Sequence, residues 1–235
     1  MSIFAIADLH LSLGADKPMH IFGASWANHE ERIRDAWTEM VGEHDTVIIP
    51  GDISWGMTME EALPDLVFLD ALPGRKILSK GNHDYWWGTM GKVENFAVEH
   101  GLFSLSFMKN NAYLIEGSAI CGSRGWLLPS DPEFRSADET VYMREVLRLE
   151  RSLEAGRALF ADGEGPMIAV LHYPPILKTQ HSSEFTELLE KFGVKICVYG
   201  HLHGRGHQKA FEGIKNGVEY RLAAGDYISF KPLRL

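Results

Sequence analysis

The chain has 235 residues, of which 45% are hydrophobic and 23% are charged, as in an ordinary globular protein. This length fits one large domain, and we expect residues 1–235 to form a single domain, because no repeat or linker-like tract interrupts them. The formal net charge of −9 argues against stable binding of duplex nucleic acid, which depends on neutralising phosphates. It does not exclude a small anionic substrate, since bound divalent cations would reverse the local field.

The N-terminus and the cysteines both favour a cytoplasmic protein. The first residues read as an apolar strand without the basic segment of a signal peptide. No apolar stretch is long enough to span a bilayer, so no membrane association is expected. Cys121 and Cys197 both lie in apolar, strand-like runs and are expected to be buried, inert thiols.

Strand-like and helix-like patterns alternate along the chain. In chain order they predict a strand at 3–7, a helix opened by a capping box of Asn28 and Glu31, a strand at 46–50, a helix at 59–72, strands at 76–78, 112–116 and 119–122, a helix opened by Ser136 and Glu139, a strand at 167–172, a helix at 183–192, and strands at 195–199 and 218–223.

Two details of this pattern bear on the fold. Pro64 inside the helix at 59–72 requires a place in the first turn or a kink. Short strands joined at Gly117 and at Asn216-Gly217 indicate antiparallel additions to the sheet. The predicted fold is α/β, with a mixed sheet or two stacked mixed sheets flanked by helices.

Side chains suited to metal binding occur where the strand-like runs end. Because the carboxyl ends of sheet strands meet at a common edge, residues far apart in sequence meet in one crevice there. Asp8 and His10 have the two-residue spacing that places both side chains on one side of an extended strand, and so do His201 and His203. The full set is Asp8, His10, Asp52, Asn82, His172, His201 and His203.

The mixture of His, Asp and Asn suits Mn²⁺, Fe or Zn²⁺ better than Ca²⁺, which prefers oxygen ligands alone. Each piece by itself has a simpler interpretation. Gly-Asp or Gly-Asn-His-Asp after a strand is commonly a turn, and a lone His172 is more often a core histidine. Coincidence at five separate strand ends favours a dinuclear metal centre over five unrelated turns.

These motifs resemble the signature of the calcineurin-like metallophosphoesterases. The similarity runs from residue 8 to residue 203, in the order of that family and with no ligand missing. It implies a two-sheet sandwich flanked by helices, the four-layer αββα arrangement, with two divalent metal ions at the strand ends. Gly51-Asp52-Ile53-Ser54 and Gly81-Asn82-His83-Asp84 depart from the serine/threonine protein phosphatase branch, whose phosphate-gripping arginine is absent.

By position in these motifs, the resemblance assigns a role to each residue. Asp8, His10 and His203 would hold one ion, Asn82, His172 and His201 the second, and Asp52 would bridge both. His83 would donate a proton to the leaving group, and Asp84 would orient the imidazole of His83. A hydroxide shared by the two ions would attack the phosphorus atom, so the expected reaction is hydrolysis of a phosphate ester.

Candidate substrate contacts are less specific. Arg124, in a glycine-flanked loop, is a candidate replacement for the missing arginine, with a surface arginine as the alternative. Tyr85 and Trp86 follow the third motif and suit either stacking on an aromatic leaving group or packing beneath the site. Residues 12–27 form a long loop of the kind that serves as a lid.

Three functions remain open at this point. A phosphoesterase acting on phosphodiesters or small phosphorylated metabolites is favoured. A nucleotide or cyclic-nucleotide phosphodiesterase or nuclease is the second, and a non-catalytic metal-binding scaffold is the third. The scaffold is disfavoured because the chain keeps every ligand and also His83.

Overall fold

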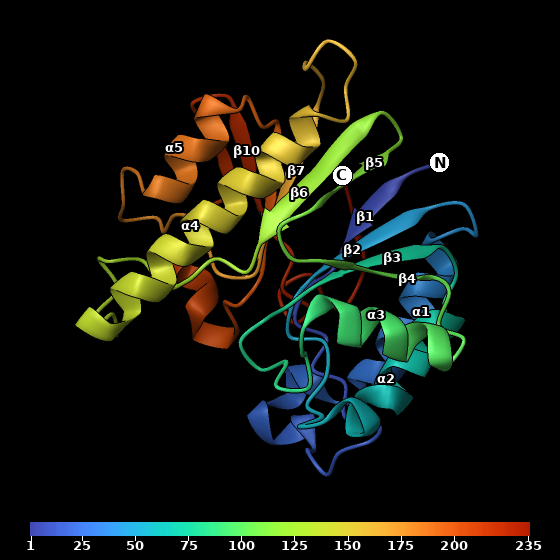
Figure 1. Cartoon of the computed structure of the whole chain (residues 1–235). Helices are drawn as coiled ribbons and strands as arrows, with labels where there is room; N and C mark the ends of the chain where they lie inside the picture. The colour runs from blue at the N-terminus through green and yellow to red at the C-terminus, as the bar shows by residue number, and fades with distance from the viewer.

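A computed structural model describes residues 1–235, and in it two β-sheets lie against each other between two groups of helices (Figure 1). The first sheet has the strand order β11-β1-β2-β3-β4. Strands β1 to β4 are parallel, and β11 pairs with β1 antiparallel. The strands are β1 (Ile3–Ala5), β2 (Thr46–Pro50), β3 (Arg75–Ser79), β4 (Leu105–Met108) and β11 (Leu233–Arg234).

The second sheet has six strands in the order β5-β6-β7-β8-β10-β9. Its four central strands are parallel, and an antiparallel hairpin closes each edge. Asn216 and Gly217 both have positive φ, as a two-residue hairpin turn requires. The strands are β5 (Ala112–Ile115), β6 (Ser118–Ser123), β7 (Met167–Leu171), β8 (Ile196–Tyr199), β9 (Gly213–Lys215) and β10 (Val218–Leu222).

The helices form the two outer layers. In Figure 1, α1 to α3 lie on the side of the first sheet, and α4 and α5 lie on the side of the second. None of these helices combines the length and the apolar composition that crossing a bilayer requires. The helices are α1 (His29–Met40), α2 (Met59–Ala71), α3 (Met90–Glu99), α4 (Ser136–Arg157) and α5 (Glu184–Lys191), with short 3₁₀ turns η1 (Met19–Phe22), η2 (Ala24–Trp26) and η3 (Gly204–Lys209).

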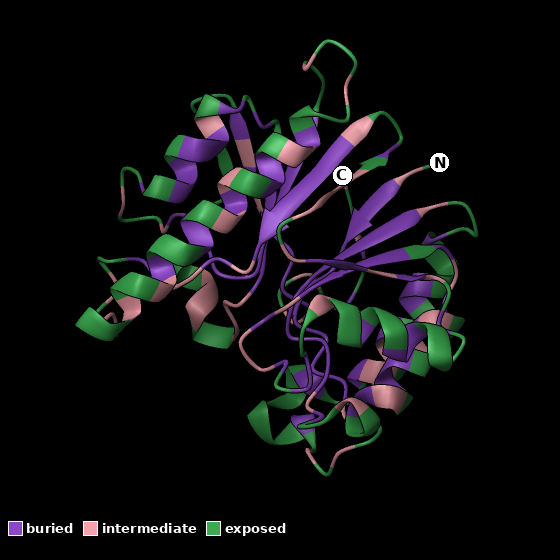
Figure 2. Cartoon of the chain, in the orientation of Figure 1, coloured by how far each residue is buried: buried purple, intermediate pink, exposed green.

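Three apolar clusters separate the four layers. One cluster of 26 buried residues joins α1, α2 and α3 to the first sheet, and one of 23 joins α4 and α5 to the second. A third cluster of 12 buried residues, including Ile48 and Val170, lies between the sheets. The central strands, such as β2 and β7, are accordingly buried on both faces, as Figure 2 shows. The predicted αββα fold is confirmed.

The helix boundaries differ from expectation at two caps and one proline. Asn28 precedes α1, but its backbone is left-handed and its side chain makes no capping bond, so the predicted capping box is absent. Helix α4 was expected to open with Ser136 and Glu139. Instead the carboxylate of Asp138 accepts the backbone amide of Arg135, the residue before the helix. Pro64 lies in the second turn of α2, not in the first. Helix α3 was not predicted.

The strand predictions were right in place and wrong mainly at the ends. Strand β1 stops at Ala5 because the next residues divide their bonds between the sheets: Ile6 donates to Ile48, and Ala7 donates to Ala223. Strands β4 and β11 were missed, and β9 was expected as the partner strand of the hairpin at Asn216-Gly217 but was given no bounds. β9 and β11 have only three and two residues, too few for an alternating pattern to be visible.

Candidate metal centre

The candidate ligands meet at the carboxyl edge where the two sheets join. The backbone of residues 6–10 lies in the seam: Asp8 donates to the Gly51 carbonyl and His10 to the Asp52 carbonyl, while Ala7 bonds to the second sheet. Segments after β1, β2 and β3 therefore face those after β7 and β8. All seven candidate side chains converge at this edge, as expected.

Four of the side chains form a tight group. One ligand atom each from Asp8, His10, Asp52 and His203 lies within 4.8 Å of the others. The Nε2 atoms of His10 and His203 are 3.2 Å apart, and His203 Nε2 is 3.4 Å from Asp8 Oδ1. Two imidazole nitrogens and two carboxylates facing one point form a donor set suited to a transition ion.

A second group adjoins the first through Asp52. The Asn82 carbonyl oxygen Oδ1 lies 2.7 Å from His172 Nε2 and 2.9 Å from His201 Nδ1. Asp52 Oδ2 is 3.5 Å from His172 Nε2 and 3.6 Å from His10 Nε2. One carboxylate oxygen thus lies between the two groups, which is the geometry that a bridging ligand needs.

The backbone reaches this arrangement by a route that the spacing argument did not foresee. Asp8, His10, Asp52 and His201 all have positive φ, between 45° and 71°. Non-glycine residues adopt this left-handed conformation rarely, and it concentrates at functional sites. The expectation that Asp8 and His10 share one side of an extended strand is therefore wrong, because the backbone there is not extended. Both side chains nevertheless reach the same point.

The glycines of the motifs permit close approach of the backbone. A Cβ added to Gly81 would lie 2.1 Å from Asp52 Oδ1 and 2.2 Å from the Asp52 amide nitrogen. A Cβ on Gly200 would lie 2.5 Å from Asp8 Oδ2. No side chain fits at either position, because each glycine packs directly against a candidate ligand.

The donor set fits divalent cations. Asp8 Oδ1 is buried and accepts no hydrogen bond, although His203 Nε2 lies 3.4 Å and His172 Nδ1 3.7 Å away, which leaves this carboxylate oxygen free to bind a cation. His172 Nδ1 lies 2.9 Å from the Pro50 carbonyl, which only accepts, so Nδ1 carries the proton and the neutral ring turns a lone pair on Nε2 toward Asn82 Oδ1. Burial, reinforced by the charges of Asp84 and Asp8, raises the pKa of Asp52 well above its usual value. A divalent cation relieves each of these conflicts.

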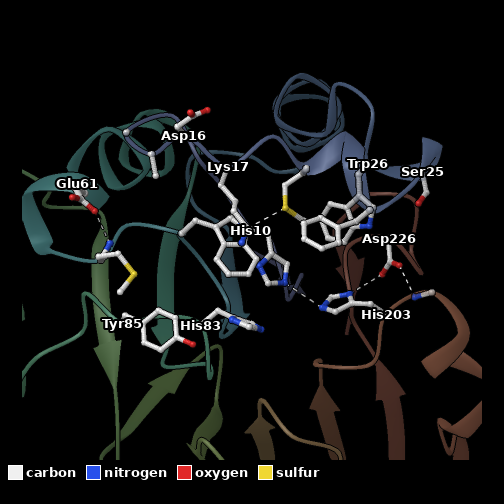
Figure 3. A pocket seen from close by; sticks show the side chains of 17 residues that line it. His10, Asp16, Lys17, Ser25, Trp26, Glu61, His83, Tyr85, His203 and Asp226 are labelled. Carbon is white, nitrogen blue, oxygen red and sulfur yellow. Dashed lines mark hydrogen bonds and ion pairs between the residues drawn. The ribbon is translucent and has the colours of Figure 1, made fainter.

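Asp226, after β10, adjoins the candidate ligands and was not predicted from the sequence. Its carboxylate accepts hydrogen bonds from His203 Nδ1 at 3.1 Å and from the Gly204 amide at 2.9 Å (Figure 3). Burial opposes the charge of His203, but Asp8 and Asp226 outweigh it and raise the pKa of His203 to about 10. A carboxylate behind a metal-binding histidine fixes its tautomer and orientation. Gly225-Asp226 after a strand repeats the Gly51-Asp52 pattern, so the sequence does contain a feature that marks Asp226 as a candidate.

The structure contradicts the role expected for Asp84. Its fully buried carboxylate accepts the backbone amides of Asp52, Ile53, Ser54 and Gly81 and the indole N–H of Trp86, and it makes no bond to the His83 ring. Its geometry is set by these five donors, which leave no oxygen turned to the imidazole. Asp84 therefore holds together the two loops that carry the second and third motifs.

His83 faces the site without a polar partner. Its Nδ1 is buried and unbonded, and its ring centroid lies 4.6 Å from that of Trp55 and 5.6 Å from that of His10. Burial and the nearby His172 lower the pKa of His83. Its amide donates to Asp52 Oδ1 at 2.8 Å, which fixes the loop beside the candidate ligands.

A cavity of about 1010 Å³ opens over the ligands. The loop over residues 12–27 forms one wall with Lys17 and Trp26, and Trp55 and Tyr85 add further aromatic surface (Figure 3). The Lys17 ammonium lies 4.3 Å from the centroid of the Trp55 ring. Movement of this loop as a lid stays a prediction.

The predicted substrate contacts separate in the structure. Tyr85 is 55% exposed and lines the cavity, whereas Trp86 is 3% exposed, lies in the first apolar cluster and bonds Asp84, so it packs beneath the site. Arg124 does not line this cavity. Its guanidinium lies 4.4 Å from the Trp126 ring centroid and faces a smaller, separate cavity.

Comparisons with known proteins agree with the fold and the motifs. The profile of the calcineurin-like phosphoesterase family matches residues 1–205. Two curated relatives are the Gene 66 proteins of Mycobacterium phages L5 and D29, which are 36% identical over 78 residues and 46% identical over 61. These alignments cover 33% and 25% of this chain, and they span only 37% and 30% of the relatives' own length.

Two solved structures share the fold over nearly the whole chain. Phosphopantetheinyl hydrolase (PptH) of Mycobacterium tuberculosis superposes with a TM-score of 0.59 and 14% identity, covering 100% of this chain and 95% of its own. A protein of unknown function from Aquifex aeolicus, AQ665, gives 0.51 and 18%, covering 99% and 95%. At these identities the likeness establishes the fold alone. The family profile, which spans the motifs from Asp8 to His203, shows that the chain belongs to the calcineurin-like phosphoesterase family.

Proposed function

We propose that the protein is a dinuclear metal-dependent hydrolase of small phosphate esters. The observation that carries the proposal is the position of Asp52 Oδ2, nearly equidistant from His10 Nε2 and His172 Nε2 in two adjoining ligand groups. A single metal site would not need the second group, and a set of structural histidines would not leave Asp8 Oδ1 unbonded.

In this proposal Asp8, His10 and His203 would hold one ion, Asn82, His172 and His201 would hold the other, and Asp52 would serve both. Mn²⁺, Fe²⁺/Fe³⁺ and Zn²⁺ all suit this nitrogen and oxygen donor set. When bound, the two ions would supply an activated hydroxide and neutralise charge on the phosphoryl oxygens.

The chain's own groups orient the substrate and assist the leaving group. His83 lines the cavity beside the ligands and would donate to the leaving oxygen, directly or as a hydrogen bond. Asp226 holds His203 in the tautomer that turns Nε2 to the centre. Tyr85 and Lys17 lie at the cavity wall, where they would meet the part of the substrate beyond the phosphate.

The cavity favours a substrate with an apolar or aromatic portion. Trp26, Trp55 and Tyr85 present aromatic surface there, and only Lys17 among its basic residues lies away from the candidate ligands. Phosphodiesters and small phosphorylated metabolites match this environment. A cavity of about 1010 Å³ is at the upper end of the range for small-molecule sites.

Hydrolysis of aryl phosphate monoesters and diesters with added Mn²⁺ tests the proposal. We expect metal-stimulated turnover that Asp52→Asn abolishes, because that change removes the bridging charge from both groups. Asp70→Asn, which changes an aspartate of α2 away from the cavity, is the control. A chain that binds metal but turns over no ester in a broad panel would be a scaffold, and the proposal would be wrong.

A nucleotide or cyclic-nucleotide phosphodiesterase is the second candidate. The aromatic rings of Trp55 and Tyr85 beside His83 favour it, because every nucleobase offers a face for stacking. A nucleotide panel distinguishes the two. If Tyr85→Ala raises KM for nucleotide diesters and leaves KM for alkyl esters unchanged, the result supports the nucleotide phosphodiesterase.

A further inference from the structure

A second cavity, of about 250 Å³, lies at the carboxyl edge of the sheets and is rich in basic side chains. Three of them come first after a strand: Lys80 after β3, Lys109 after β4 and Arg124 after β6. Arg144 and Arg148 reach it from α4. Both sheets and one helix therefore contribute, at the edge where α/β proteins bind their ligands.

The charge in this cavity is opposite to that of the whole chain. Five basic residues and a single acidic one, Glu145, line it, in a protein with a formal net charge of −9. Glu145 is buried, and its Oε1 lies 2.5 Å from Arg148 Nη1, 3.8 Å from Arg124 Nη2 and 3.9 Å from Arg144 Nε. One carboxylate does not neutralise five cations, so the cavity keeps a positive field suited to an anion.

Two polar atoms of residues that line the cavity are buried and lack a partner in the protein. They are the Arg124 Nε–H, which is a donor, and Glu145 Oε2, which is an acceptor. When these two side chains turn toward the cavity, an anion with both bare oxygens and a hydroxyl group satisfies the two together. Hydrogen phosphate has both, whereas sulfate carries no proton near neutral pH.

The guanidinium of Arg124 is held in place for such a ligand. It lies over the ring of Trp126, whose indole N–H donates to Asp138 at 3.0 Å. A stacked guanidinium loses little freedom on binding an oxyanion and can do so through two parallel N–H bonds. Lys80 donates to the Trp87 carbonyl at 3.0 Å, which closes this side of the cavity.

The basic cavity is distinct from the one over the metal centre. The two have no lining residue in common, and none of the seven candidate metal ligands lines the smaller one. A ligand held by Arg124, Arg144 and Arg148 would therefore not be the ester bond undergoing hydrolysis.

We propose that this cavity is a second anion site, selective for a protonated phosphate group as in hydrogen phosphate or pyrophosphate. The oxyanion oxygens accept from the three arginines, and the phosphate hydroxyl donates to the Glu145 carboxylate, which turns its unbonded oxygen Oε2 toward the cavity on binding. The site does not depend on the proposed hydrolysis, because it needs no metal ion.

Calorimetric titration of the full chain in EDTA tests the site apart from the metal centre. With sodium phosphate we expect one bound anion per chain, and with sodium sulfate weaker binding. Arg144→Gln with Arg148→Gln should weaken phosphate binding about 10–100-fold, the cost of losing charge-assisted hydrogen bonds. Arg151→Gln, an exposed residue of α4 outside the cavity, is the matched control and should leave binding unchanged.

Glu145→Gln gives a change of the opposite sign that misfolding cannot produce. Removing the carboxylate should strengthen sulfate binding about ten-fold or more and so reduce the preference for phosphate. Pyrophosphate in place of phosphate shows whether a terminal phosphoryl group is preferred to the free anion. The proposal is refuted if the unsubstituted chain binds no phosphate in EDTA, if the double variant binds it as tightly, or if Glu145→Gln fails to improve sulfate binding.

Discussion

Replacing Asp65 by Asn should remove a pH-dependent component of stability that the structure makes measurable. Asp65, in α2, is fully buried and accepts hydrogen bonds from the Ser54 hydroxyl at 2.5 Å and the Leu13 amide at 2.8 Å. It thus fixes the start of the loop that walls the large cavity. Burial, against these hydrogen bonds, raises the pKa of Asp65 to about 6 from 3.8.

The sign of the effect follows from proton linkage. Because the pKa is higher in the folded state, Asp65 favours folding most below its unfolded pKa, and this contribution disappears as the pH rises through about 6. With pKa values of about 6 folded and 3.8 unfolded, the linkage relation gives about 1.4 kcal/mol between pH 5.0 and pH 7.5. Asn at this position has no such dependence, and its amide oxygen can still accept one of the two hydrogen bonds.

Urea unfolding of both proteins at pH 5.0 and 7.5, under identical metal-free conditions, measures this difference. The stability lost in Asp65→Asn should be about 1.4 kcal/mol smaller at pH 7.5 than at pH 5.0. Asp70→Asn, whose half-buried carboxylate bonds Ser104 from the same helix, controls for changes in helix charge. Equal losses at both pH values would show that Asp65 titrates alike in the folded and unfolded chains and would refute the reasoning.

Three further changes probe the metal centre. Asp226→Asn should weaken binding of one metal ion about 10–100-fold in a chelator competition assay, because the Asp226 carboxylate orients His203. The control is His207→Gln, which alters another partner of the same carboxylate and should change metal affinity little. His83→Ala should lower kcat about 10²–10⁴-fold with the metal content unchanged, and retained turnover would remove the leaving-group role. Gly81→Ala should destabilise the fold by several kcal/mol in thermal unfolding, since its Cβ would lie 2.1 Å from a ligand oxygen, whereas Gly91→Ala meets no atom within 4 Å and should be neutral or better.

The sequence predicted the ligands well because their chemistry and their order along the chain are local features. Asp8, Asp52 and His172 each follow or end an apolar run, and parallel strands bring such ends to one edge whatever the details of the loops. The two-layer sheet and its flanking helices followed from the same runs. Strand ends were less certain, since Ala7 leaves one sheet for the other through a bond that depends on tertiary structure.

The roles of the neighbouring residues were not predictable in this way. Asp84 has the same chemistry whether it bonds an imidazole or four backbone amides, and only the folded loops show that the amides take both oxygens. Trp86 and Tyr85 are adjacent and similar, yet one is buried under the site and the other faces the cavity. Asp226 was not predicted for a different reason, because it lies beyond His203, where the known motifs end.

The strained backbone of the centre connects these observations. Asp8, His10, Asp52 and His201 each hold a left-handed conformation that costs of order 1–3 kcal/mol, so it persists only where surrounding contacts determine it. Those contacts are present: Asp8 Oδ2 accepts the His201 amide at 2.8 Å, and Asp84 Oδ2 accepts the Asp52 amide at 2.9 Å. Asp52 Oδ1 likewise accepts the His83 amide at 2.8 Å, so Asp8 and Asp52, the carboxylates that would bind metal, also bind the backbone of neighbouring motifs. Substitutions at these aspartates will alter loop geometry as well as metal affinity, whereas His83, whose ring bonds nothing in the protein, tests the chemistry alone.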